Sequence, residues 1–288
     1  MLLYGANLSA ITGVTLQPTG TLTGDGRISG HLTNLGTVQA DNLSVSETFV
    51  NAGLINGSGY LNATLSNVAL GKVRTAAGEH LRVVGGAHSL ILSGNSNTTF
   101  YDALDVQSGG ELRVSNGSAA VFFGQVNQRT GSIFAGTGSK FYEGGLSIGG
   151  SPGLGFDAGN VSFGSGNVYL EKIGGLAAGT EFDKYVVAGA LSFGGTLNVV
   201  WWGGFVGAEG ESFDLFDWGS STGTFSTLDF SAAPLAAGLT WDASKLYLTG
   251  EIAITAVPEP ESWALLLAGL GIVGSAARRA RRQGHGSS

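Results

Sequence analysis

The sequence contains no cysteine among its 288 residues. Disulfides, thiolate metal sites and cysteine nucleophiles are therefore excluded. Charged residues are also scarce, at 12% against about 25% in an average soluble protein. So few ionisable groups leave little material for an acid–base active site. The fold must depend instead on backbone hydrogen bonds and apolar packing.

Lysine and arginine are outnumbered by aspartate and glutamate over most of the chain. The formal net charge is −7, and residues 256–288 hold four arginines against Glu259 and Glu261, so residues 1–255 carry −9. A surface of this sign repels phosphate groups. We therefore expect no nucleic-acid partner.

Metal-binding and catalytic motifs are absent as well. There is no Gly-x-Ser-x-Gly elbow and no phosphate-binding loop that ends in Gly-Lys-Ser/Thr. The histidines form no His-Glu-x-x-His pair, so we expect no metal and no cofactor. They are scattered over the chain as His31, His80, His88 and His285.

Two further features could carry chemistry. Asp25, between two glycines, resembles one unit of a calcium-binding β-roll, but the second copy of this segment has Ser58 there, so a turn is expected. A polysaccharide lyase or glycosidase on a β-helix would need paired carboxylates, or an acid beside a basic residue. The candidates for this least favoured alternative are Asp102 with Asp105, Glu111 with Arg113, and Glu209 with Glu211.

Glycine is abundant, with 50 residues, and the segment from residue 12 to 150 consists of short alternating runs between Gly, Asn and Ser. Residues 22–28 recur as residues 55–61, and the match extends to Asn34 and Asn67. Strands this short bury a continuous apolar face only when coil stacks upon coil. The repeats favour an all-β parallel β-helix, or β-solenoid, over residues 1–146.

Asparagines in this segment support two architectures. Asn34, Asn51, Asn67 and Asn116 suit the turns of coils of about twenty residues. The dipeptides Asn56-Gly57 and Asn116-Gly117 are instead typical of hairpins, which leaves an antiparallel sandwich as the alternative.

Residues 147–255 are richer in aromatic side chains, and glycine pairs separate their apolar runs. This pattern predicts a β-rich capping region that covers the last coil. Turns are expected at residues 174–175, 194–195, 203–204, 207–210 and 219–223. The expected strands are Val168–Ile173, Lys184–Val187, Thr196–Trp201, Ser212–Phe216, Leu239–Trp241 and Leu246–Ile254.

This region resembles the C-terminal part of autotransporter-type β-strand-repeat proteins. The resemblance lies in Ser151-Pro152-Gly153, Gly195-Thr196-Leu197 and Gly238-Leu239-Thr240-Trp241-Asp242. It implies the end of a β-helical passenger, without the outer-membrane barrel of a true autotransporter.

Three tryptophans are candidates for contact with carbohydrate, because sugar rings pack on aromatic faces. They are Trp201, Trp202 and Trp218. Adjacent residues of a strand face opposite ways, so one of Trp201 and Trp202 is expected in the core and the other outside.

The last segment, residues 256–288, combines a proline-flanked motif, an apolar run and an arginine cluster in fixed order. A run of about fifteen apolar residues is short for a membrane span of roughly 17–25, and a basic flank holds its end in the cytoplasm. The residues are the motif Pro258, Glu259 and Pro260, the anchor Trp263, Leu265, Leu266, Leu267, Leu270, Ile272 and Val273, and the stop Arg278, Arg279, Arg281 and Arg282.

This arrangement resembles the PEP-CTERM sorting signal of Gram-negative bacteria. The resemblance implies a short transmembrane helix, removal of the tail by a membrane-embedded exosortase, and delivery to the cell surface or the extracellular matrix. Residues 1–9 show no signal-peptide pattern, so we expect upstream residues that this sequence does not include.

The sequence therefore predicts an exported, non-catalytic protein with a structural or adhesin-like role. Its expected partners are an exosortase, the inner membrane and an exopolysaccharide. A carbohydrate-binding module is the main alternative.

Overall fold

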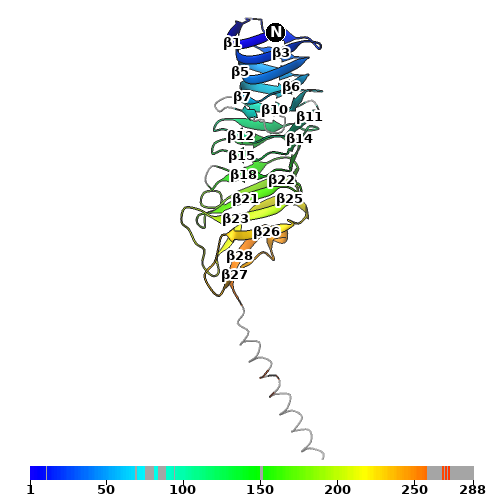
Figure 1. Ribbon diagram of the computed structural model, residues 1–288. Coiled ribbons are helices and arrows are strands. Elements are labelled where there is room, and N and C mark those ends of the chain that lie inside the picture. Colours follow the sequence, from blue (N-terminus) through cyan, green and yellow to red (C-terminus); the bar gives the residue numbers. More distant parts are fainter. Residues whose placement is uncertain are drawn as a thin grey trace, which may run out of the picture.

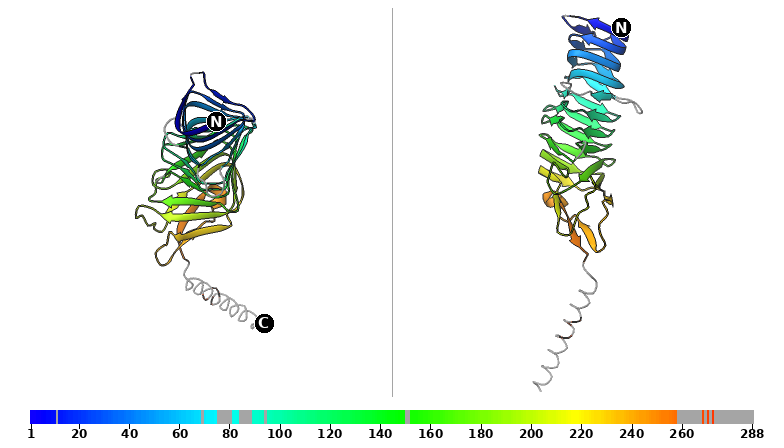
Figure 2. Two further views of the ribbon diagram at one scale, coloured as in Figure 1. Left: turned by 45° about the horizontal axis from the view of Figure 1, so that its top comes forward. Right: turned by 90° about the vertical axis from the view of Figure 1, so that its left-hand side faces the viewer.

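The computed structural model describes residues 1–10, 12–68, 70–74, 81–83, 89–93, 95–149, 152–257, 268, 270 and 272. The body is an elongated stack of coils in which strands pair in parallel (Figure 1). Its N-terminal strand lies at one end and an antiparallel sheet at the other (Figure 2). The parallel β-solenoid expected from the repeats is confirmed.

One twelve-stranded sheet runs along the N-terminal half of the described chain. Its main path is β1 (Leu2–Ser9), β3 (Thr21–Ser29), β5 (Thr37–Asn51), β7 (Gly59–Asn67), β10 (Ser89–Leu92), β13 (Glu111–Val114) and β16 (Ile133–Ala135). Five short strands belong to the same sheet but lie off its main path. They are β2 (Val14–Leu16), β4 (Leu32–Asn34), β6 (Leu54–Asn56), β8 (Lys72–Arg74) and β9 (Leu81–Val83).

Two further parallel sheets continue the stack toward the C-terminal end. The seven-stranded sheet holds β11 (Asn97–Phe100), β14 (Ala119–Phe122), β17 (Ser139–Tyr142), β20 (Val161–Phe163), β22 (Lys184–Phe193), β19 (Leu154–Asp157) and β25 (Phe216–Gly223). The six-stranded sheet holds β12 (Leu104–Val106), β15 (Val126–Gln128), β18 (Leu146–Ile148), β21 (Val168–Ile173), β23 (Thr196–Trp201) and β26 (Thr227–Ala232).

The register of these sheets gives the coil length. Thr21 pairs with Thr37, a step of 16 residues, whereas Ser89 pairs with Glu111, a step of 22. Coils therefore vary around the expected twenty residues. Parallel pairing continues past residue 146 to β26, because β21, β23 and β26 lie side by side.

The interior is filled by side chains that alternate along each strand. In the seven-stranded sheet, aromatic rings stack from coil to coil. The ring centroids of Phe100 and Phe122 are 5.0 Å apart, and those of Phe122 and Tyr142 are 5.2 Å apart. Each ring is at most 1% exposed, so this ladder forms the core of three successive coils.

The Gly24-Asp25-Gly26 segment lies inside β3, opposite bulges of the neighbouring strands β1 and β5, and the expected turn there is wrong. Both glycines have positive φ, and the register against β1 and β5 shifts at this point. A Cβ on Gly24 would lie 1.7 Å from the Leu3 carbonyl oxygen. Only glycine allows the strand to bend here while it stays hydrogen-bonded.

Three of the four asparagines expected in turns form a buried ladder at one corner of the coils. The Asn34 amide donates to Oδ1 of Asn51 at 2.7 Å, and the Asn51 amide donates to Oδ1 of Asn67 at 2.5 Å. All three side chains are fully buried. Asn116 instead lies in an exposed turn. The hairpin alternative is wrong, because the strands that flank both Asn-Gly dipeptides lie in parallel pairs.

The C-terminal end of the body is a small antiparallel sheet with the order β24 (Ser212–Asp214), β28 (Glu251–Ala256) and β27 (Leu239–Asp242). The expected strand over residues 246–254 is wrong in its first half, since Leu246–Thr249 forms the short helix α1. Gly250 ends it with φ of 82° and leads into β28. The turn expected at residues 219–223 is also wrong, because these residues belong to β25.

Candidate functional site

The three tryptophans occupy different environments at the C-terminal end of the solenoid. Trp201 ends β23, packs 5.3 Å from Trp241 between ring centroids, and donates its indole N–H to the Pro234 carbonyl at 2.9 Å. Trp202 points outward and is 42% exposed. Trp201 is partly buried against the core, so the two side chains differ in environment, but neither is a fully buried core residue. The structure does not bring the three together as one aromatic platform, since Trp218 packs edge-on against Phe193.

Three of the carboxylates considered for catalysis, Asp105, Glu111 and Glu211, are engaged with near neighbours. Both oxygens of Asp105 accept from the Arg129 guanidinium, at 2.7 and 2.9 Å. Glu111 pairs with Arg113 at 2.5 Å on the same strand. Glu211 accepts from the Ala208 backbone N–H at 2.8 Å, and Glu209 is exposed.

Of the four histidines, the structure describes His31. Its side chain is exposed, and its Nε2 lies 2.6 Å from Glu47. His80, His88 and His285 lie outside the described residues. Within the part of the chain that the structure describes, no three His, Asp or Glu side chains gather as a metal site.

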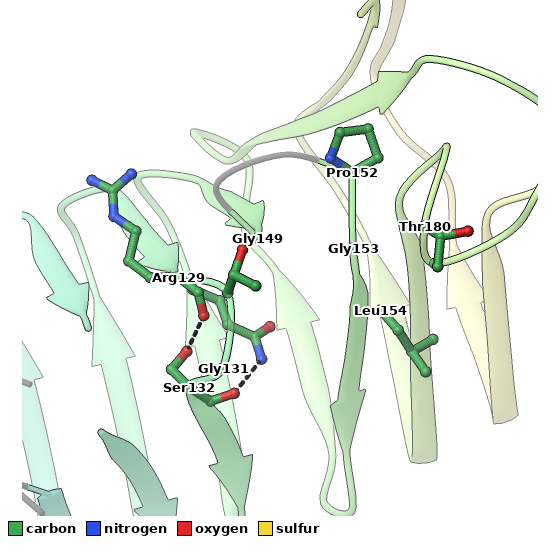
Figure 3. A pocket seen from close by; sticks show the side chains of 11 residues that line it. Arg129, Gly131, Ser132, Gly149, Pro152, Gly153, Leu154 and Thr180 are labelled. Atoms are coloured by element: carbon green, nitrogen blue, oxygen red, sulfur yellow. Dashed lines mark hydrogen bonds between the residues drawn. The ribbon is translucent and has the colours of Figure 1, made fainter. Parts of the chain in front are cut away.

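A surface cavity of about 340 Å³ lies between turns of neighbouring coils. Figure 3 shows the turn of Arg129 and Ser132 on one side, with Pro152, Leu154 and Thr180 across from it. Gln128 also lines it, and its Oε1 has no hydrogen-bond partner. The lining offers hydroxyl and amide groups beside Arg129, whose guanidinium is paired with Asp105.

Two lysine–carboxylate pairs are buried inside the solenoid, and sequence analysis missed both. Nζ of Lys140 lies 2.5 Å from Asp157, and Nζ of Lys172 lies 2.7 Å from Asp183. Burial raises the pKa of both carboxyls, that of Asp183 to about 6. The sequence held a signal: in Ser139–Tyr142, alternation places Lys140 on the same face as the core residue Tyr142.

Glu171 is a third buried carboxyl, next to Lys172 in β21. Its side chain is fully buried. Burial, reinforced by the nearby Asp183 carboxylate, raises the pKa of Glu171 well above its ordinary value. Both effects favour the neutral acid over the carboxylate.

The sorting segment begins where the folded body ends. The body closes with β28 and the hydrogen bond from the Val257 N–H to the Gly238 carbonyl at 2.8 Å. Leu270 and Ile272 are helical and more than 60% exposed. The motif, arginine stop and remaining anchor residues lie outside the described residues: Pro258, Glu259, Pro260, Trp263, Leu265, Leu266, Leu267, Val273, Arg278, Arg279, Arg281 and Arg282.

Most of the expected transmembrane helix lies outside the described residues. None of the helices within the described residues has the length and hydropathy that crossing a bilayer requires.

Comparison with known proteins identifies one segment of the chain. Neither the curated proteins nor the solved structures gave a match. The resemblance of residues 147–255 to autotransporter-type proteins stays a prediction. Residues 256–282 match the model of the PEP-CTERM protein-sorting motif, which indicates an exported protein that is anchored at the membrane and processed by an exosortase.

Proposed function

We propose that the chain is a non-catalytic structural or adhesin-like protein of the cell surface or extracellular polysaccharide matrix. The observation that supports this most is the position of the sorting motif. It starts at residue 256, and β28 ends at Ala256. Cleavage near Pro258–Pro260 would therefore release the body with all its described strands.

The shape of the body supports a structural role. Coils about 4.8 Å apart form a rod whose core is continuous from Leu3 to Ile254. A rod of this kind presents a long side surface and needs no disulfide to keep its shape. Scarce charge and many short polar side chains suit a hydrated matrix.

The test is localisation in a host that contains an exosortase. The protein without substitutions is expected in the surface or matrix fraction, with its C-terminal tail removed. A variant with Pro258, Glu259 and Pro260 all replaced by alanine is expected to stay full-length in the inner membrane. Pro18→Ala, at an exposed turn of the body, is the matched control. Equal surface delivery of the triple variant would contradict the proposal.

Carbohydrate binding is the second candidate function, and the exposed Trp202 favours it. Gly203 and Gly204 follow it, and nothing lies within 4 Å of a Cβ on either, so the indole stands beside open space. Binding to the host exopolysaccharide should be lost in Trp202→Ala and kept in Tyr101→Ala, which alters another exposed aromatic residue. Degradation of the polysaccharide by the unchanged chain would instead favour the lyase or glycosidase alternative.

A further inference from the structure

Lys140 and Asp157 join neighbouring parts of the solenoid inside its core. Lys140 lies on β17 and Asp157 on β19, and both side chains are 0% exposed. Nζ of the lysine is 2.5 Å from Oδ1 of the aspartate. A nitrogen hydrogen-bonded to a carboxyl oxygen lies within about 3.5 Å of the carboxyl carbon, which is the separation of a near-attack geometry.

The two buried lysines differ in how well their ammonium groups are solvated by the protein. An ammonium has three protons to donate. Lys172 has three acceptors, namely Asp183 at 2.7 Å, the Ile148 carbonyl at 2.8 Å and the Ser147 hydroxyl at 3.3 Å. Its charge is therefore fully hydrogen-bonded, and the ion pair is stable.

Among the described residues, Lys140 has only the Asp157 carboxylate and, at 3.4 Å, the Ala135 carbonyl as acceptors. At least one ammonium proton therefore lacks an acceptor among them, in a site without solvent. Burial also raises the pKa of Asp157, despite the lysine beside it. Both facts make the separated charges of this pair costly, and a proton that moves from Nζ to Oδ1 along their hydrogen bond removes them.

The other carboxyl oxygen is held by a phenol. The Tyr185 hydroxyl donates to Oδ2 of Asp157 at 3.0 Å, and Tyr185 is fully buried. The backbone N–H of Gly159 also faces this carboxylate. Donors on the oxygen that becomes negative during an attack on the carboxyl carbon stabilise the transition state.

We propose that Lys140 and Asp157 condense to an intramolecular isopeptide bond. One Nζ proton moves to Oδ1, and Nζ then attacks Cγ. A second Nζ proton follows to Oδ1, the Cγ–Oδ1 bond breaks, and Oδ1 leaves as water. Oδ2 remains as the amide carbonyl oxygen, hydrogen-bonded to Tyr185. Atoms and charge balance without a co-reactant, because the ion pair contains all the protons that water needs.

Such a bond would fasten neighbouring coils covalently in a chain that has no cysteine. It does not depend on the proposed surface role, since it forms from folding alone. Lys172 and Asp183 are the internal comparison, because their complete hydrogen bonding keeps them as ions.

Mass spectrometry of the purified full chain, denatured before measurement, tests the proposal. The linked protein is lighter than its sequence by one water, about 18 Da, because the condensation expels it. Trypsin cleaves after lysine and arginine, but an amidated Lys140 resists. The expected product is one peptide of residues 130–172 that lacks one water, with no fragment ions between Lys140 and Asp157.

Three variants show which groups are responsible. Asp157→Ala should restore the sequence mass and cleavage after Lys140, and Asp183→Ala should keep the loss of water. Tyr185→Phe should lower the linked fraction several-fold. A succinimide at Asp25-Gly26 would have the same mass but leave Lys140 cleavable. Separate, unmodified peptides 130–140 and 141–172 from the folded, unchanged protein would overturn the proposal.

Discussion

At the scale of single residues, the buried asparagine ladder of the N-terminal coils is the feature that tolerates substitution least. Asn34, Asn51 and Asn67 pair directly in register, one per coil. Asn51 lies in the middle, where it accepts from one neighbour and donates to the other, to the Gly53 carbonyl and to the Lys72 carbonyl. Each amide therefore satisfies groups of two coils at once.

Replacing the middle asparagine should destabilise the body strongly. Asn51→Ala removes the donor to the buried Oδ1 of Asn67 and one of the two acceptors of the Asn34 amide. The expected cost is about 2–4 kcal/mol in the free energy of unfolding. Denaturant-induced unfolding measures this. Asn116→Ala, in an exposed turn, should change it by less than about 0.5 kcal/mol. Equal effects of the two variants would refute the ladder's role.

The buried acids give the body an unusual pH dependence. Folding raises the pKa of Asp183 from 3.8 to about 6, mainly through burial, and raises that of Glu171 well above its ordinary value. The folded state therefore binds these protons more tightly than the unfolded chain. The free energy of unfolding should fall as pH rises from about 4 to 6, by about 3 kcal/mol for Asp183, and the titration of Glu171 should lower it in the same direction.

Replacing Glu171 isolates its part of this dependence. Glu171→Met has similar length and no charge to bury, so the free energy of unfolding at pH 8 should rise by about 1–3 kcal/mol. The decline of the free energy of unfolding with rising pH should also be smaller in the variant. Unfolding curves at pH 5 and pH 8 provide the measurement. If the unsubstituted protein and the variant lose the same free energy between these two pH values, Glu171 does not contribute to the pH dependence.

At the scale of elements, strands inside the solenoid were predictable and those near its end were less so. Val168–Ile173 and Thr196–Trp201 match β21 and β23, because alternation within one coil is a local signal. Leu246–Ile254 failed because Leu-Tyr-Leu fits one turn of helix equally well. The Tyr247 hydroxyl accepts from the Phe225 N–H at 2.9 Å, a tertiary contact invisible in the local pattern.

The antiparallel sheet makes a prediction about truncation. β28 lies between β24 and β27 and buries Ile252 and Ile254 completely. A chain that ends at Val257 should unfold at the same denaturant concentration as the full chain, since it keeps this strand. A chain that ends at Gly250 should lose several kcal/mol, because two core side chains and the strand's hydrogen bonds are removed. Equal midpoints for both truncations would contradict this role of β28.

At the scale of the whole molecule, features within one continuous segment could be predicted from the sequence. Contacts between residues of different coils could not. The sorting motif is a single segment and was recognisable from its residues alone. The Lys140–Asp157 and Lys172–Asp183 pairs depend on register between coils, which the repeats left undefined. Coil lengths of 16 and 22 residues in one stack show why a fixed period could not align them.

The most direct test of the account is the C-terminus of the protein recovered from its native host. Mass spectrometry of the surface and matrix fraction should find a chain that ends near Pro258–Pro260. The peptides around Arg278–Arg282 should be missing, while those of β28 remain. An exported, full-length chain that still carries these arginines, or a full-length chain confined to the cytosol, would contradict the central claim.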